Sequence, residues 1–292
     1  MTTEAHAGYY LPQPSHWPLV GTVGLFIMLG GVAMSVNGYG IGTFLMGVGF
    51  AVLVTMLVGW FGTVIGESEG GLFNKQVDVS YRWAMSWFIF SEVMFFAAFF
   101  GALYYAREFS IPWLDGQGAK FATGELLWPK FEATWPLLST PDATKFAGPE
   151  QAMGWSGIPL YNTLILLSSG VTVTLAHWAL KAANRAALVF WLFVTVALGF
   201  TFLGMQIYEY HHAYTEMGLK LTSGIYGTTF FMLTGFHGAH VTIGATMLTV
   251  ILFRCIKGHF KPDHHFAFEG VAWYWHFVDV VWLGLFIFVY LL

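Results

Sequence analysis

The sequence predicts an all-α, polytopic membrane protein, and three observations support this fold class. The chain of 292 residues is 57% hydrophobic and only 10% charged, whereas soluble domains carry about 25% charged residues. Its mean hydropathy is +0.63, and its aromatic content of 19% is typical of proteins anchored at two membrane interfaces. Seven apolar runs come close to or exceed the roughly 20 residues that a membrane-spanning helix needs. The runs are Pro18–Val36, Gly40–Ile65, Val79–Ala106, Ile158–Leu180, Ala186–Ile207, Ser223–Phe253 and Phe266–Leu292.

The totals also exclude several classes of protein. A formal net charge of −4 is too small to indicate a nucleic-acid partner. Because Cys255 is the single cysteine, the chain has no internal disulfide and no thiolate metal cluster. The segment Met1–His16 lacks a basic stretch followed by an apolar core, so we expect an extramembrane tail and not a cleaved signal peptide.

The first two runs are joined only by Asn37–Tyr39, a link so short that it predicts an antiparallel helical hairpin. Small residues recur in this hairpin, and Gly62 and Gly66 lie four apart, a spacing that lets helix backbones approach closely. We favour packing within the hairpin over contact with a partner subunit or lipid. Residues 1–66 are treated as one part of the molecule and residues 67–292 as the other. Within the second part, residues 107–156 carry five prolines and predict a long, irregular extramembrane loop.

The orientation of the chain follows from the basic residues in its short loops. On the side of the N-terminus these residues are Lys75, Arg82, Lys181, Arg185, Arg254, Lys257 and Lys261. On the other side the short loops contain only Lys220. Since basic residues are enriched in cytoplasmic loops, the N-terminus is predicted to be cytoplasmic and the C-terminus to lie on the opposite side.

Glu92 is an acidic residue at membrane depth. It lies 13 residues beyond Val79, or about 20 Å along a helix, which is close to the middle of a hydrocarbon core about 30 Å thick. Desolvation favours the neutral carboxylic acid there. Two interpretations remain open: a proton-linked group or polar anchor for a lipid or partner helix, and a neutral side chain hydrogen-bonded to a nearby carbonyl or hydroxyl.

Histidine is frequent, and His237, His240, His276 and Asp279 are predicted to lie at a similar depth. A metal ion bound by these four residues is one interpretation, and a di-iron enzyme with histidine boxes is another. We favour hydrogen bonds between helices, because the remaining histidine pairs, His211-His212 and His264-His265, fall at opposite membrane surfaces. We therefore predict no catalytic residue and no metal site on this chain.

Two further acidic residues lie close to predicted span ends. Glu209 is placed where interfacial water can reach it, beside Tyr208 and Tyr210. Glu269 opens the last span, where a helix N-terminus stabilises a carboxylate.

Several stretches are similar to one known family. They are Ser91–Phe96, Asn162-Thr163, Ser169–Thr172, Ala176-His177, Glu209-Tyr210, Gly224–Phe231, Thr234–Val241, His264–Phe266, Phe268-Glu269 and Ala272–Trp282. On these residues the chain resembles subunit III of the cytochrome c oxidases, the accessory membrane subunit of haem-copper terminal oxidases.

The resemblance implies a particular architecture and set of partners. It implies two helices set apart from five by a V-shaped cleft filled with lipid, in a multi-pass protein of the cell inner membrane with a periplasmic C-terminus. The expected partners are subunit I and subunit II, which hold the haem and copper, and cytochrome c is the electron donor to the complex. This chain would carry no redox centre, and it would stabilise the catalytic subunit, support proton uptake and bind phospholipid.

The resemblance also assigns roles to individual residues. It makes Glu67 and Arg254 the residues near lipid headgroups, and a guanidinium suits a phosphate because it can bind two oxygens at once. Glu92 matches the intramembrane carboxyl of the family. Two other functions remain alternatives, namely subunit III of a related quinol oxidase and a self-contained proton carrier centred on Glu92.

Overall fold

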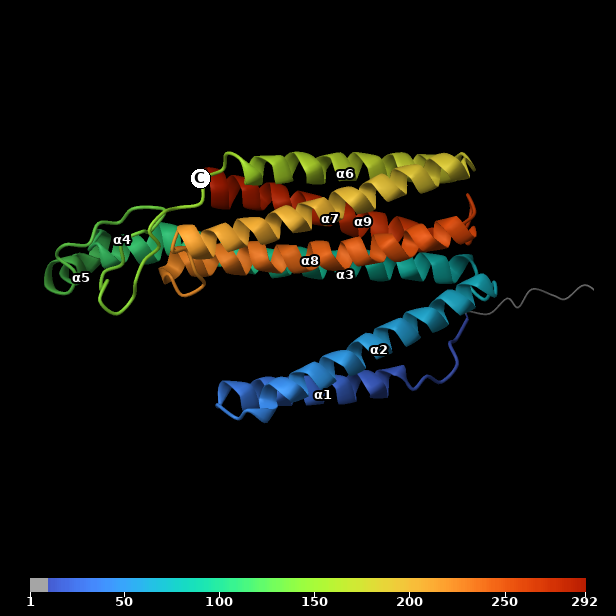
Figure 1. Ribbon diagram of the computed structural model, residues 1–292, viewed down its shortest axis with the longest axis horizontal. Coiled ribbons are helices and arrows are strands. Elements are labelled where there is room, and N and C mark those ends of the chain that lie inside the picture. Colours follow the sequence, from blue (N-terminus) through green and yellow to red (C-terminus); the bar gives the residue numbers. More distant parts are fainter. Residues whose placement is uncertain (1–9) are drawn as a thin grey trace, which may run out of the picture. The chain divides into compact units, whose positions relative to one another are not determined.

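The computed structural model describes residues 10–292, so the first nine positions of the predicted Met1–His16 tail lie outside the described residues. Among the described residues, seven helices are long and apolar enough to cross a membrane, which confirms the predicted number of spans. The chain divides into two compact units, one ending at Tyr81 and the other running from Arg82 to Leu292 (Figure 1). The predicted lipid-filled cleft between two helices and five stays a prediction.

The first unit contains a helical hairpin made of α1 (Trp17–Val36) and α2 (Ile41–Glu69). The predicted turn is present, and Gly38 adopts a φ of +81° in it, a conformation that glycine reaches without strain. Trp17 donates a hydrogen bond from Nε1 to Thr63 Oγ1 over 3.1 Å, which joins the open end of the hairpin.

Glycines form the contact between these two helices. A Cβ atom added at Gly31 would lie 2.5 Å from the backbone nitrogen of Met46, and a Cβ atom at Gly42 would meet the backbone of Ser35. Nothing larger than glycine fits where two backbones touch. For these positions the predicted packing within the hairpin is confirmed, whereas a Cβ atom at Gly62 or Gly66 would meet no atom within 4 Å.

The second unit is a bundle built from most of α3 (Lys75–Tyr105), α6 (Ile158–Lys181), α7 (Arg185–Glu216), α8 (Gly224–Lys257) and α9 (Phe266–Leu285). Helix α9 packs against α6 and α8, and α7 packs against the same two helices. The turns from α6 to α7 and from α8 to α9 are short, so these pairs are antiparallel neighbours (Figure 1).

Trp275 of α9 lies at the centre of this bundle and is fully buried. Its indole Nε1 donates to Ser169 Oγ of α6 over 2.9 Å. Its ring fills a slot in which a Cβ atom at Gly199 of α7 would be 2.9 Å away and one at Gly244 of α8 would be 2.8 Å away. One side chain therefore contacts three neighbouring helices.

The helices run further than the apolar stretches predict. Helix α7 continues to Glu216 and α8 to Lys257, beyond the predicted ends at Ile207 and Phe253. Hydropathy marks where apolar side chains stop, but backbone hydrogen bonding continues until a cap ends it. Helix α8 ends at Gly258, whose φ of +80° lets its N–H bond back to Arg254 and Cys255, as in other helices that end on a left-handed glycine.

The prediction of an irregular loop over residues 107–156 is wrong for its first part. Helix α3 continues through a π-helical turn (Ala106–Ser110) into α4 (Ile111–Leu114), and a 3-10 turn (Gly118–Lys120) leads into α5 (Phe121–Leu126). Pro112 in the first turn of α4 directly follows the π-helical turn, where the regular α-helical hydrogen bonding is already interrupted.

The rest of this segment is irregular but tied to the helices. Glu150 donates its backbone N–H to the carbonyl of Met217, and Met153 donates to the hydroxyl of Tyr226, each over 3.0 Å. Within the segment, a hydrogen bond from the Thr144 hydroxyl lowers the pKa of Asp142 below its ordinary value. The segment is therefore an ordered part of the second unit.

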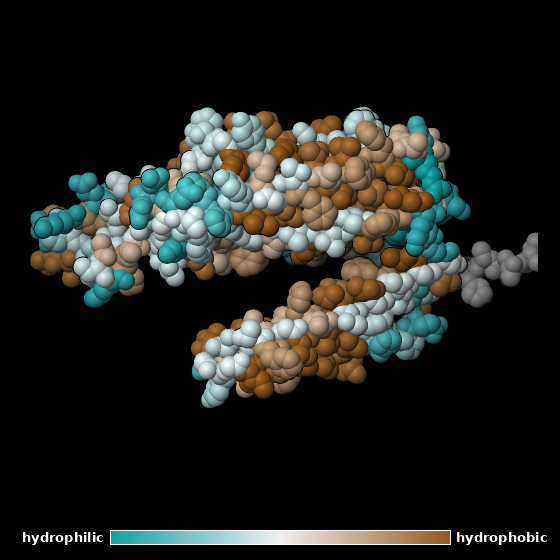
Figure 2. Space-filling model, in the orientation of Figure 1, coloured by the Kyte–Doolittle hydropathy of each residue, from teal (hydrophilic) through white to brown (hydrophobic). Residues whose placement is uncertain are grey.

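The surface of the second unit agrees with a membrane environment. Figure 2 shows apolar side chains across the middle of this unit and hydrophilic ones towards its two ends. Large apolar side chains such as Phe193 and Ile207 are 59% and 71% exposed. Exposing this much apolar surface to water would be unfavourable, whereas contact with lipid is not.

The hairpin contact predicts a difference between two adjacent glycines. Gly31→Ala should destabilise the protein by about 1–3 kcal/mol, because its methyl group would collide with the backbone of α2. Gly30→Ala is the matched control, since a Cβ atom there meets nothing within 4 Å. The measurement is thermal unfolding of the purified complex in mild detergent, and equal melting temperatures for the two variants would contradict the prediction.

Candidate functional site

Glu92 of α3 and His240 of α8 form a pair inside the membrane region. Glu92 Oε2 lies 2.8 Å from His240 Nε2, and the two side chains are 23% and 12% exposed. Glu92 thus has a hydrogen-bond partner on another helix. Sequence reasoning named both residues, but it did not join them.

The hydrogen bonds of His240 show how many protons this pair holds. Its Nδ1 lies 2.6 Å from the carbonyl oxygen of Phe236. A carbonyl oxygen only accepts, so Nδ1 carries a hydrogen. One proton is then needed between Nε2 and Glu92, either on the acid or on the imidazole. Both arrangements have zero net charge, which is the state that a low-dielectric region favours.

Aromatic rings surround the imidazole of His240. The ring of Phe96 lies 4.9 Å away, and those of Phe95 and Phe277 lie 5.9 Å and 6.3 Å away. The hydroxyl of Tyr274 lies 3.4 Å from the carbonyl oxygen of His240. These rings exclude water from one side of the pair, so the single proton has few places to go within the chain.

His237 is separated from this pair. It is fully buried, and its Nε2 lies 3.2 Å from the carbonyl oxygen of Val278 on α9. Its ring packs between those of Phe202 and Trp282. This is the hydrogen bond between helices that the sequence analysis favoured.

His276 and Asp279 form a third, separate arrangement on α9. His276 Nδ1 lies 3.5 Å from Asp279 Oδ2, and His276 Nε2 lies 3.3 Å from Thr174 Oγ1 of α6. Gly170 of α6 leaves the room for the Asp279 carboxylate, which a Cβ atom at that position would hit. In the described part of the chain, the four residues considered for one metal ion therefore use three different sets of partners.

The His276 side chain lines a shallow groove on the outer wall of the bundle between α6 and α9. The groove has a volume of about 500 Å³, and its other walls are mostly apolar: Leu167, Val171, Leu175, Trp178, Val280 and Leu283. His276 is 46% exposed there, whereas Asp279 is only 8% exposed. A polar ring on a wall of this kind is unusual at membrane depth.

A fourth group of polar side chains was missed by the sequence analysis. His177 at the end of α6, His265 before α9 and Glu269 in the first turn of α9 point to one place. The other oxygen of Glu269 forms an ion pair with Arg82 of α3. The signal was the i,i+4 spacing of His265 and Glu269, but the helix-dipole interpretation of Glu269 did not include any side-chain partner.

The expectation for Glu209 is wrong. It was predicted to meet interfacial water, but it is 1% exposed and accepts a hydrogen bond of 2.7 Å from the Tyr290 hydroxyl. Its helix α7 continues past the membrane surface, and the π-helical end of the chain (Phe286–Leu291) covers it with Tyr290.

The two residues predicted near lipid headgroups lie in different units. Glu67 lies in the last turn of α2 and is a hydrogen-bond partner of Tyr10. The pKa of Tyr10 is raised, mainly by desolvation and also by this carboxylate. Arg254 lies in the last turn of α8 and is 8% exposed, with its guanidinium 4.5 Å from the ring centre of Phe260.

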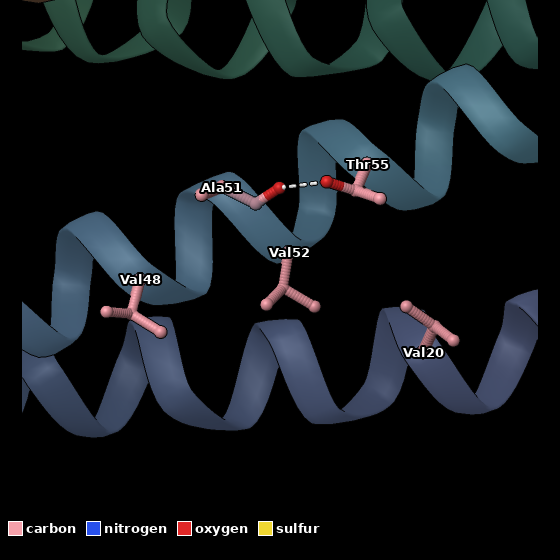
Figure 3. A pocket seen from close by; sticks show the side chains of 5 residues that line it. All are labelled: Val20, Val48, Ala51, Val52 and Thr55. Atoms are coloured by element: carbon pink, nitrogen blue, oxygen red, sulfur yellow. Dashed lines mark hydrogen bonds between the residues drawn. The ribbon is translucent and has the colours of Figure 1, made fainter.

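A second groove lies on the hairpin. Its volume is about 420 Å³, and Figure 3 shows its lining, with Val20 on α1 and Val48, Val52 and Thr55 on α2. The Thr55 hydroxyl donates to the carbonyl of Ala51 over 2.9 Å, so even the polar lining atom is satisfied within its own helix. The groove is therefore apolar in character.

Comparison with known proteins identifies the family of the chain. The family model for cytochrome c oxidase subunit III matches residues 6–115 and 146–292. The chain belongs to the cytochrome c oxidase subunit III family. The match omits residues 116–145, which lie in the segment that connects α4 to α6.

Individual relatives cover the chain from end to end. Proteins named cytochrome c oxidase subunit 3 from Dugong dugon and Squalus acanthias are 39% and 40% identical over 291 residues. The one from Drosophila yakuba is 38% identical over 292 residues. Each alignment covers 99% of this chain and 98% of the relative. The chain is thus a multi-pass membrane subunit of an oxidase complex.

The Glu92–His240 pair predicts different results for two substitutions. Glu92→Gln should leave assembly and melting temperature almost unchanged, because its amide N–H can donate to His240 Nε2 as a carboxylic acid does. Glu92→Ala should cost about 1–3 kcal/mol, since it leaves a buried acceptor without a partner. Thermal unfolding of the purified complex checks both. A loss in Glu92→Gln as large as in Glu92→Ala would show that the carboxyl group itself is required.

Proposed function

We propose that this chain is a subunit of an aerobic respiratory cytochrome c oxidase that has no redox centre of its own. In this proposal it stabilises the catalytic subunit I, supports proton uptake by the complex and binds phospholipid. Electron transfer from cytochrome c and reduction of oxygen take place on the haem and copper of subunits I and II. The observation that carries the proposal is the use of buried polar groups to join helices, as in the bonds of His237 and Trp275.

The α6–α9 groove supports contact with a partner inside the membrane. A half-exposed imidazole facing lipid is costly, so such groups usually face protein. His276 lies in a wall of apolar side chains that a transmembrane helix can cover. We assign this face to subunit I, which would supply the missing surroundings of His276.

The Glu92–His240 pair supports a role linked to protons. The pair has zero net charge with its one proton on either residue, and it changes charge only by gaining or losing a proton. Glu92 has His240 as its hydrogen-bond partner in the described part of the chain. The aromatic rings around that imidazole favour a supporting role within a complex over a self-contained proton carrier.

The location of the chain is also a proposal. We place it in the cell inner membrane with a cytoplasmic N-terminus and a periplasmic C-terminus. The orientation is supported by the clustering of basic side chains at one end of the second unit, near the ends of α6 and α8 and the start of α9. These residues are Arg82, Lys181, Arg185, Arg254, Lys257 and Lys261.

The first test is copurification with haem. The tagged chain, expressed with its neighbouring subunits and extracted in mild detergent, should carry haem in a fixed ratio. A tagged chain that never retains haem would contradict the proposed function. Electron donors are distinguished by activity, because a cytochrome c oxidase oxidises reduced cytochrome c whereas a quinol oxidase does not.

The interface assignment has its own prediction. Val280→Trp, which fills the α6–α9 groove, should reduce the haem recovered with the tagged chain at least about fivefold, because 1 kcal/mol of lost affinity already changes a ratio by about that much. Ile243→Trp on α8 is the matched control, since both side chains are more than half exposed, at 66% and 52%. Loss of haem in Ile243→Trp alone would place the interface on α8 and contradict the assignment.

The lipid assignment predicts a change in bound phospholipid. Arg254→Ala should lower the phospholipid content of the complex, because the planar guanidinium that can bind a phosphate through two hydrogen bonds is removed. Lys257→Ala, one turn further along α8, is the control and should leave the content unchanged. Lipid content is measured by mass spectrometry, and equal values for Arg254→Ala and the unmodified protein would contradict a headgroup contact at Arg254.

A further inference from the structure

Three ligand-type atoms meet at the end of the second unit where α6 finishes and α9 begins. His265 Nε2 lies 3.1 Å from Glu269 Oε1 and 3.2 Å from His177 Nε2. His177 Nε2 lies 3.4 Å from the same oxygen of Glu269. The atoms thus form a nearly equilateral triangle, which hydrogen bonding between only two of them would not require.

The size of this triangle matches one face of a tetrahedral metal site. Zinc binds imidazole nitrogen and carboxylate oxygen at about 2.0–2.2 Å. In a tetrahedron with bonds of that length, neighbouring ligand atoms are about 3.3–3.6 Å apart. The three observed separations are equal to this spacing or shorter by a few tenths of an ångström. Two histidines and one carboxylate also form a donor set that zinc uses with its fourth position open.

The hydrogen bonds around His265 leave a lone pair directed at the centre. Its Nδ1 lies 3.0 Å from the carbonyl oxygen of Lys261, so Nδ1 carries a hydrogen, and a ring with that single hydrogen has a bare Nε2. That nitrogen faces a carboxylate oxygen, which is also an acceptor. A single N–H from His177 can point along only one side of the triangle, so a cation at its centre would satisfy all three atoms.

Arg82 orients the carboxylate from outside the triangle. It pairs with Glu269 Oε2 and lies with its guanidinium 5.2 Å from the ring centre of Phe266. This leaves Oε1 facing the two imidazoles. Partners of this kind fix the direction of metal ligands in known sites. The positive charge of Arg82 also opposes a divalent ion, so the affinity should be lower than that of a structural zinc site.

The ligand side chains are shielded but not sealed. His265 and Glu269 are 7% and 11% exposed, and His177 is 21% exposed. Basic and polar residues of the turns lie at the same end of the bundle, so an ion can arrive from the aqueous phase without crossing the hydrocarbon core. A bound ion would join α6 to α9 at the membrane surface.

We propose that His177, His265 and Glu269 form a binding site for a divalent transition metal, with Zn²⁺ as the ion that suits their geometry and chemistry. The site is distinct from the Glu92–His240 pair and does not depend on the role of that pair. It also differs from our sequence-based prediction of no metal site on this chain.

The test measures zinc on the assembled, haem-bearing complex. The complex is stripped with a chelator and dialysed against zinc sulfate, and the zinc bound per chain is measured by plasma mass spectrometry. The unmodified protein should bind one zinc more per chain than His177→Asn or Glu269→Gln. Because the comparison is a difference, zinc held elsewhere in the complex cancels.

The matched control is another histidine–glutamate pair in the same chain. His212 Nδ1 lies 3.2 Å from Glu216 Oε2 in the last turns of α7, and among the described residues this pair is not part of a group of three ligand-type side chains. His212→Asn should therefore bind as much zinc as the unmodified protein. Equal zinc in all four proteins would overturn the proposal, and so would a loss of one zinc in His212→Asn.

A second measurement does not depend on the variants being assembled. The X-ray absorption spectrum of zinc added in stoichiometric amount to the stripped, unmodified complex should fit two imidazole nitrogens and carboxylate oxygen at about 2.0–2.2 Å. A spectrum with sulfur ligands, or with only water-like oxygen ligands, would overturn the proposal.

Discussion

The helix packing of the second unit depends on the Trp275 indole, which joins α9 to α6, α7 and α8 at the centre of the bundle. Inside a membrane, helices gain little from burying apolar surface against each other, so close packing and hydrogen bonds must hold them. Trp275 supplies both, because its ring fills the space left by Gly199 and Gly244 while its N–H bonds to Ser169. Trp282 repeats the arrangement two turns along α9, with a hydrogen bond of 2.9 Å to Thr163. Small residues on three helices and large rings on the fourth are therefore one design.

The polar groups of the bundle obey the same constraint. Several of them are buried with a partner on a neighbouring helix, as in the 2.8 Å contact between the hydroxyls of Thr172 and Thr195. Where a polar side chain is not enclosed by its own chain, as at His276, the surroundings favour completion by a partner. Exposed polar side chains at membrane depth thus indicate where a partner binds, whereas enclosed ones stabilise the fold of this chain.

The sequence predicted the number of spans and the hairpin, because these depend on distances along the chain. It did not predict that Glu92 meets His240, or that His177 meets His265 and Glu269. Such pairings depend on how each helix is rotated about its axis. In water that rotation can be inferred from an apolar stripe, but these helices are apolar on nearly every side. The prediction that interfacial water reaches Glu209 was wrong for a related reason, since Glu209 is covered by Tyr290, near the C-terminal end of the sequence. Helix ends were predicted too early because hydropathy does not report caps such as Gly258.

The backbone N–H groups of Glu150 and Met153 bond to the carbonyl of Met217 at the end of α7 and to the hydroxyl of Tyr226 on α8, and these bonds restrain the segment before α6. Helix α7 extends well past its apolar stretch, so the Met217 carbonyl that accepts from Glu150 lies at the end of a long helix, beyond the apolar stretch. A segment bonded to the end of this helix has restricted motion. Its amide hydrogens near residue 150 should exchange with solvent as slowly as those of α7. The segment should also resist proteolytic cleavage there.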